Sequence, residues 1–346
     1  MTQTQQWSLK TAAQIDETDY AQWQQLVDEY HQGNPILSAQ FVKLLLEFFC
    51  SDYYLTSCIE GDATKCMLLI QKRKFGIWQV VQPSQAPLAL IVGHTNFTPS
   101  FSALLQKLPN LAFRLDFICL DPLEHGQLLE LLKNHAVVHS MKNIRVAAEQ
   151  DFDVYWAERS KNLRKNIKRY QHRIESDQKA LRFIVYTDPL AMSSAVGRYG
   201  LLESKGWKGK NGTALHPSNS QGVFYQTYLA TCDQSNSTPF VMELYLNEDL
   251  IASRLCCFNE NIFTILKTAY DEDFKNYAPG RLLLAEVIKY VLDKKISKTI
   301  DFYTNATEEQ IDWASDVRTM YKASYYKNSI IKNLTATISH IKRKIL

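Results

Sequence analysis

Residues 267–281, KTAYDEDFKNYAPGR, connect an apolar strand to a helix through the pair Pro279-Gly280. The first NH groups of a helix have no partner within it and can therefore bind an anion. Gly280 lets the backbone approach an oxygen closely, and Arg281 offers a charge-assisted contact. The segment predicts an anion site at the helix start that would suit a diphosphate. An ordinary helix start with proline in a tight turn is the alternative.

The elements around this segment form a strand meander followed by a helix and one further strand. Their expected ranges are 240–246, 251–258, 262–269, 281–293 and 299–303, with three-residue turns at 247–249 and 259–261. A meander whose third strand leads into a helix and another strand is an α/β arrangement with one crossover. Before it we expect a long amphipathic helix, a strand, a helix, an irregular segment and a helix, at 151–178, 181–186, 189–203, 205–220 and 222–232. A helical tail ends the chain.

The first half of the chain has a similar order of elements. We expect helices at 20–30, 38–49, 99–108 and 122–134, and strands at 53–59, 65–71, 76–81, 112–120 and 137–146. No low-complexity or Pro/Gly-rich linker separates the halves, so the boundary follows from the order of elements. This order predicts two α/β domains, 1–150 and 151–346, each with a mixed, mostly antiparallel sheet flanked by helices.

Short sequence blocks in the second half follow one another in a recognisable order. They are Gly206-Trp207-Lys208-Gly209, Leu250-Ile251-Ala252, Ala269-Tyr270-Asp271 with Tyr277-Ala278-Pro279-Gly280, and Ile300-Asp301-Phe302. Together they resemble the cellulose-biosynthesis-type acetyltransferase domain of the GNAT superfamily, which is similar to the Fem-type peptidyltransferases. The resemblance implies tandem GNAT folds. In the first half Thr98-Pro99-Ser100 stands where the second has its Pro-Gly pair, so that half looks like a degenerate copy.

The resemblance also implies a donor substrate, because the GNAT fold places acyl-CoA diphosphate at the start of the helix after the central strand. That place coincides with the anion site inferred above. The donor is then acetyl-CoA or another acyl-CoA, and no metal is expected. The residues expected to bind it are Tyr277, Ala278, Pro279, Gly280, Arg281 and Leu282.

Direct transfer of an acyl group from a thioester to an amine needs a base for the amine and a proton for the thiolate. Asp301, Glu203 and Asp271 are the candidate bases. Desolvation in an apolar strand would raise the pKa of Asp301 toward a useful range, whereas a strand end facing solvent or capping a turn is the alternative. Tyr321 or Tyr325 could protonate the thiolate, as a tyrosine does in many GNAT enzymes.

Acceptor binding is expected from Trp207, Lys208, Lys267 and Tyr270. The Trp207 indole, in a glycine-rich loop, could stack on a sugar or adenine, and Lys208 could meet a phosphate or carboxylate. A tryptophan that covers the core is the alternative. Polysaccharide-linked members of the family usually have a glycine-rich turn and a Tyr-Lys pair soon after the Asp-Phe pair. Here 303–307 reads YTNAT, which weakens any inference about the acceptor.

The strongest local charge bias lies in the long helix that opens the second half. Its basic residues are Arg159, Lys161, Arg164, Lys165, Lys168, Arg169 and Arg173, with His172 among them. They could meet a polyanionic acceptor, the 3'-phosphate of coenzyme A or a membrane surface. A solvated helix face is the simpler interpretation. The tail 328–346 also mixes apolar and basic residues and is expected to pack on the domain.

Bulk composition limits the classes of function. The chain has 346 residues, 46% hydrophobic, and a formal charge of +3, which is too small to imply DNA binding. Its polar N-terminus lacks the apolar core of a secretory signal, and no apolar run reaches the length of a membrane span. Seven cysteines without a C-x-x-C pair favour neither a disulfide framework nor a zinc site. These features predict a cytoplasmic protein.

Three functions are consistent with the sequence. The first is acyl transfer, with acetyl as the expected group, from coenzyme A to an amine of a sugar, an amino acid or an envelope or polysaccharide precursor. The second is Fem-like transfer from aminoacyl-tRNA, in which the basic helix would contact RNA. The third is an inactive scaffold in envelope-polysaccharide assembly, whose basic helix would meet polymer or lipid head groups.

Overall fold

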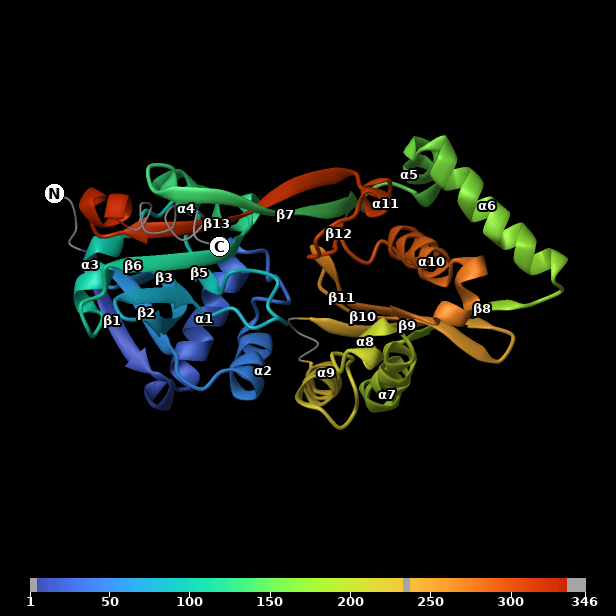
Figure 1. Cartoon of the computed structure of the whole chain (residues 1–346), viewed down its shortest axis with the longest axis horizontal. Helices are drawn as coiled ribbons and strands as arrows, with labels where there is room; N and C mark the ends of the chain where they lie inside the picture. The colour runs from blue at the N-terminus through green and yellow to red at the C-terminus, as the bar shows by residue number, and fades with distance from the viewer. Residues whose placement is uncertain (1–4, 233–236, 335–346) are drawn as a thin grey trace, which may run out of the picture. The chain divides into compact units, whose positions relative to one another are not determined.

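The computed structural model describes residues 5–232 and 237–334 (Figure 1). The chain divides into two compact units, of which the first is Met1–Lys142 with Arg318–Leu346 and the second is Asn143–Val317. The second boundary differs from the sequence-based division, because the C-terminal segment belongs to the first unit. Instead of the expected helical tail, this segment contains most of strand β13 (Asp316–Tyr326). The end of the tail, 335–346, lies outside the described residues.

Unit 1 is built on a mixed sheet in the order β1-β2-β3-β4-β6-β13, with β5 paired to β3. All pairs are antiparallel except β4 with β6. The strands are β1 Gln5–Thr11, β2 Tyr54–Glu60, β3 Ala63–Lys74, β4 Ile77–Val80, β5 Ile91–Gly93 and β6 Arg114–Leu120. The helices are η1 Ala12–Gln14, α1 Glu17–Tyr30, α2 Ala39–Phe49, α3 Phe101–Lys107 and α4 Pro122–Leu132. Strands β1 and β5 were not expected from the sequence.

Unit 2 has the sheet order β7-β12-β11-β10-β9-β8, antiparallel except for the pair β11–β12. The strands are β7 Ala136–Ala147, β8 Leu181–Tyr186, β9 Thr238–Leu246, β10 Asp249–Phe258, β11 Ile262–Tyr270 and β12 Thr299–Asp301. The helices are α5 Phe152–Glu158, α6 Lys161–Ser176, α7 Pro189–Lys205, α8 Trp207–Lys210, α9 Ser220–Thr231, η2 Glu272–Tyr277, α10 Pro279–Lys294 and α11 Glu308–Ile311. The predicted α/β class, with a mixed and mostly antiparallel sheet flanked by helices, is confirmed.

The helices of unit 2 cover both faces of its sheet. Figure 1 shows α10 on one side of β9–β11 and α7 with α9 on the other. Helix α10 is held there by an apolar face, because Leu283, Val287 and Val291 are completely buried against the sheet core. Burial of one such side chain stabilises the fold by roughly 1.5–3 kcal/mol. The start of α10 is therefore held at a defined place above the ends of β10 and β11.

Two local expectations were wrong. The long helix at 151–178 is instead two helices, because Ser160 begins α6 anew and its hydroxyl accepts from the Leu163 amide at 3.1 Å. The turn between β9 and β10 has two residues rather than three, since Asn247 adopts the left-handed conformation (φ 53°) that a tight hairpin needs.

Candidate functional site

The connection from β11 to α10 has an unusual start. Ala278 adopts a left-handed conformation (φ 51°, ψ 54°) immediately before Pro279, and alanine has no side-chain acceptor with which to cap the helix. The amides of Arg281 and Leu282 donate to the Ala278 carbonyl at 2.9 and 3.1 Å. Within the described part of the chain, no hydrogen bond from the Gly280 amide is found. This amide and the positive end of the helix dipole are thus available to an anion.

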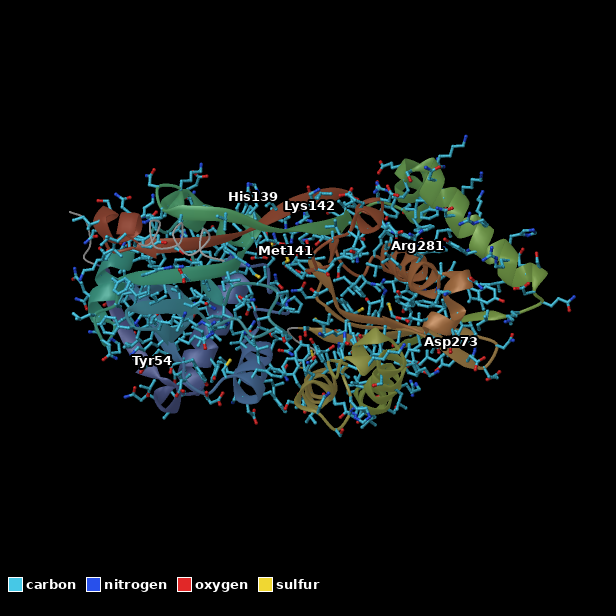
Figure 2. All side chains as sticks on the ribbon, viewed as in Figure 1. Tyr54, His139, Met141, Lys142, Asp273 and Arg281 are labelled. Atoms are coloured by element: carbon cyan, nitrogen blue, oxygen red, sulfur yellow. The ribbon has the colours of Figure 1, made fainter. Side chains whose placement is uncertain are left out.

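A pocket of about 310 Å³ opens beside this helix start. Its wall includes three cationic side chains, Arg254, Lys275 and Arg281, and one carboxylate, Glu309. Figure 2 shows Arg281 on α10 and Asp273 on the preceding η2. The remaining lining residues are Thr268, Tyr270, Ala278, Pro279, Gly280, Leu284, Gln310 and Trp313. The excess of cations favours a negatively charged ligand.

The Tyr270 ring packs closely against Gly280. A Cβ added at Gly280 would lie 3.2 Å from Cδ1 of the Tyr270 ring, which is tighter than ordinary van der Waals contact. The Tyr270 side chain is 47% exposed and forms part of the pocket wall. A larger residue at 280 would therefore push into the ring or fill the space next to the Gly280 amide.

Arg281 is paired, whereas Arg254 is not. Arg281 forms an ion pair with Glu309. Desolvation acts against the charge of Arg281, but the hydrogen bond and the opposite charge of Glu309, together with Tyr170, outweigh it, and the pKa of Arg281 is raised. Arg254, at 6% exposure, has no acidic partner among the described residues, and burial lowers its pKa to about 10. It remains a cation at neutral pH.

Sequence reasoning missed Arg254 as a site residue. A signal was present, because Arg254 is the only charged residue in the run 251–258, IASRLCCF. A charge within an apolar strand is rarely buried unless it has a partner or a ligand. The register pairs Arg254 with Thr268 of β11, another residue of the pocket wall.

The expected donor-binding residues divide into two groups. Ala278, Pro279, Gly280 and Arg281 line the pocket, as expected. The Tyr277 hydroxyl instead donates to Asp177 Oδ2 at 2.6 Å, just beyond the end of α6. Leu282 is 2% exposed and packs in the core, so only its backbone faces the helix start.

Asp301 lies at the end of β12 and is 3% exposed. Its Oδ1 accepts from Asn143 Nδ2 at 2.8 Å and from the Tyr303 amide at 3.2 Å. The carboxylate therefore connects β7 to the turn that follows β12. Its role as a base stays a prediction.

Glu203 and Asp271 are also buried and bound by several donors. Glu203 accepts from the Tyr199 hydroxyl at 3.0 Å, from the Leu215 amide at 2.7 Å and from Lys208. It thereby holds the segment after α7 in place. Asp271 caps η2 and pairs with Lys205 Nζ at 2.9 Å. Both carboxylates fulfil structural roles in the conformation described.

Tyr321 lies in unit 1, on β13, where its ring contacts that of His139 at a centroid distance of 5.2 Å. Tyr325 follows on the same strand and contacts His135. None of the candidate catalytic residues, Asp301, Glu203, Asp271, Tyr321 and Tyr325, lines the pocket at the start of α10. The structure therefore brings the donor-binding segment together but not the candidate catalytic groups.

The acceptor-binding candidates are likewise dispersed. Tyr270 lines the pocket, while Lys208 is paired with Glu203. The Lys267 ammonium lies over the Tyr225 ring at 5.5 Å, and burial lowers its pKa. Trp207 begins α8, but its side chain is outside the described atoms.

Across residues 5–232 and 237–334, no group of three or more His, Cys, Asp or Glu side chains is arranged to hold a metal ion. Over the same residues, no helix has the length and apolar character needed to cross a bilayer.

Comparison with protein families matches residues 161–314 to the acetyltransferase (GNAT) domain. Unit 2 therefore carries a GNAT acyltransferase domain. This confirms the family that the sequence blocks resemble. No curated protein matches the chain by sequence.

Solved structures share the fold over nearly the whole chain. The match to the structure of FemX covers 94% of this chain and 99% of the FemX chain, with 10% identity and a TM-score of 0.58. The C-terminal domain of a putative lysylphosphatidylglycerol synthetase from Agrobacterium fabrum covers 94% and 96%, with 13% identity and a TM-score of 0.57. L-PGS from Bacillus licheniformis covers 92% and 96%, with 13% identity and a TM-score of 0.54. At these identities the likeness concerns the fold.

Proposed function

We propose that the GNAT domain transfers an acyl group, acetyl in the first instance, from coenzyme A to an amine. The observation that carries this proposal is the pocket at the start of α10, where the unpartnered Gly280 amide and the three cationic side chains meet. A diphosphate bears two negative charges, and its oxygens accept hydrogen bonds from helix-start amides. The pocket therefore suits the diphosphate of an acyl-CoA.

The proposed reaction is direct. The amine nitrogen attacks the thioester carbonyl carbon, the carbon–sulfur bond breaks, the thiolate takes up a proton and the amine gives one to a base. Asp301 is the preferred base, because it ends the strand next to β11 and is buried, with Glu203 and Asp271 as alternatives. The acceptor amine belongs, in this proposal, to a sugar, an amino acid or an envelope or polysaccharide precursor.

One feature favours a second candidate function, Fem-like transfer from an aminoacyl-tRNA. Helix α6 exposes a row of cations and is connected to the pocket region, because Arg173 Nη1 donates to the Asn276 carbonyl of η2 at 2.6 Å. Such a row suits a phosphate backbone. The fold is similar to that of FemX. A membrane surface with anionic head groups is a further partner for the same row of cations.

Thermal unfolding with candidate donors tests the proposal. A donor present at about 100 times its dissociation constant should stabilise the protein by roughly 2.7 kcal/mol. We expect acetyl-CoA or a longer acyl-CoA to raise the melting temperature, while adenosine at the same concentration should not. Stabilisation by charged aminoacyl-tRNA alone would favour the second function. If no donor stabilises the protein, the domain is instead a binding or scaffold protein.

A further inference from the structure

The pocket at the start of α10 contains a buried cation for which residues 5–232 and 237–334 supply no counter-charge. Arg254 is 6% exposed, and its Nε is buried with no hydrogen-bond partner among the described residues. Its Nη2 makes one long contact, 3.4 Å to the Gly280 carbonyl. A buried guanidinium normally gains several charge-assisted hydrogen bonds in return for its lost hydration. Among the described residues, the Arg254 guanidinium gains almost none of these hydrogen bonds.

The position of Arg254 indicates what is missing. Its side chain lines the same wall as Ala278 and Gly280, so the guanidinium and the first turn of α10 face one pocket. The other cations there are either paired, as Arg281 is with Glu309, or more loosely placed, as Lys275 is on the exposed side of η2. Arg254 is thus the fixed and unneutralised positive charge of this site.

A second arginine of unit 2 shows the usual arrangement. Arg198 Nε donates to both oxygens of Glu243, at 3.0 and 3.2 Å, and Glu243 is completely buried. The protein therefore provides a buried carboxylate where it uses arginine for structure. At Arg254 it provides only a carbonyl at the edge of hydrogen-bond distance and an open pocket.

Building on the acyl-CoA proposal, we infer that Arg254 is a specificity-determining residue of the donor site. Its guanidinium binds phosphate oxygens of the donor from β10, while the Gly280 amide binds them from the start of α10. The planar guanidinium offers paired NH donors that match a phosphate. The site would thereby select donors that carry a diphosphate over thioesters of the same pantetheine arm without phosphates.

Titration calorimetry of Arg254→Met with three donors tests this inference. The donors are acetyl-CoA, its 3'-dephospho form, which keeps the diphosphate, and acetyl-pantetheine, which has no phosphate. We expect the variant to lose at least about tenfold in affinity for the first two, and to bind the third as the wild type does. Arg254→Gln serves as a second variant of similar size, and Arg182→Met, at a half-exposed position outside the pocket, is the control.

Thermal stability provides an independent measurement, because a buried unpaired charge destabilises the folded protein. Without ligand, Arg254→Met should melt at the same temperature as the wild type or higher, since an apolar side chain of similar volume replaces a desolvated cation. A structural arginine would behave in the opposite way. Lower melting of the methionine and glutamine variants without ligand would overturn the inference.

The outcomes separate this inference from the proposed function. If the wild type binds acetyl-CoA and the Arg254 variants bind it equally well, the inference is wrong and acyl-CoA binding stands. If the wild type binds no acyl-CoA, the proposed function is wrong. In that case inorganic pyrophosphate is the probe, and binding that is lost in Arg254→Met would retain Arg254 as a phosphate-binding residue. Where the wild type does bind acetyl-CoA, an unchanged preference for acetyl-CoA over acetyl-pantetheine in the Arg254 variant would contradict the inference.

Discussion

Each unit has a proline at or just before the start of a helix, and the two helix starts have different surroundings. Helix α10 begins at Pro279, whereas Pro99 lies two residues before Phe101, the first residue of α3. In unit 2 the Pro279-Gly280 start faces a pocket of about 310 Å³, and the Gly280 amide has no partner within the described chain. In unit 1 the Pro99-Ser100 start is bound by β1. The Gln5 Oε1 accepts from the Ser100 amide at 2.8 Å, and the Trp7 indole donates to the Ser100 carbonyl at 3.0 Å.

The cavity beside the helix start of unit 1 is also smaller than the pocket beside the helix start of unit 2. The one in unit 1 measures about 50 Å³, and several of its polar groups bond to one another, although His125 Nε2 is buried without a hydrogen-bond partner in the described part of the chain. His31 Nδ1 lies 2.7 Å from Glu124 Oε2, and Asn34 donates to the other oxygen of Glu124 at 2.9 Å. The Gly93 amide donates to His31 Nε2 at 3.1 Å. The polar groups at the start of α10 are thus more open to a ligand than those beside the start of α3.

The largest expected effect comes from closing the unit 2 pocket. Gly280→Trp should place an indole against the Tyr270 ring and the helix-start amides, which we expect to lower acyl-CoA affinity by at least about a hundredfold. Calorimetric titration with acetyl-CoA measures the loss. Gly197→Trp on α7 is the matched control, because a Cβ at that glycine meets no atom within 4 Å. Retained affinity in Gly280→Trp would show that the donor binds elsewhere.

An acid-sensitive effect is expected from the cavity of unit 1. Burial, followed by the charge of His31, lowers the pKa of His125 from 6.5 to about 4. Between these values the unfolded chain binds a proton that the folded one does not, so stability falls as the pH falls through this window. The loss reaches about 3 kcal/mol at its lower end. Glu124, whose pKa is also lowered, adds to the loss below its ordinary value of 4.5.

Urea unfolding at pH 7 and pH 4.5, with hydrogen exchange to identify the unit that opens, measures this effect. His125→Gln should have a flatter pH dependence than the wild type between pH 6.5 and 4. Arg254 of the other pocket does not titrate in this range, since it keeps a pKa of about 10. Equal pH dependence in the variant and the wild type would show that other groups dominate.

The smallest expected effect concerns the internal cap of unit 1. Gln5→Ala removes the acceptor for the Ser100 amide and the donor to the Thr98 carbonyl, and should cost about 1 kcal/mol of unfolding free energy. Denaturant unfolding measures this loss of unfolding free energy, with the exposed neighbour Gln6→Ala as control.

The wild type should bind one acetyl-CoA per chain. A stoichiometry of two would mean that the helix start of unit 1 is also a donor site.

The fold followed from the sequence where local pattern decides structure. The meander 240–269 and the helix after it were predicted because strands and helices of ordinary length carry clear apolar periodicities. Strand β13 was missed because its partner, β6, lies about two hundred residues earlier, as in the pair Tyr325 with Leu115. Such pairing leaves little trace in the local sequence.

The candidate site was predictable in part for the same reason. The segment 278–281 is contiguous, and an anion site could be predicted there from Pro279-Gly280 and Arg281 together with the neighbouring sequence blocks. Arg254 joins the site through strand register, and Asp301 acquires its partner Asn143 from a residue 158 positions away. The carboxylates that looked catalytic in the sequence prove to hold backbone amides and lysines, which only three-dimensional placement reveals.

The two boundaries of unit 2 fall within strands, and this affects how the chain folds. Unit 1 is built from two segments that are far apart in the sequence, since Arg318 of β13 forms a buried ion pair with Asp121, with Nε to Oδ2 at 2.8 Å. During synthesis Asp121 is made long before Arg318, and all of unit 2 emerges between them. Unit 2 therefore has every residue it needs while unit 1 still lacks a strand. The acyltransferase domain should therefore mature first, and unit 1 must wait for β13.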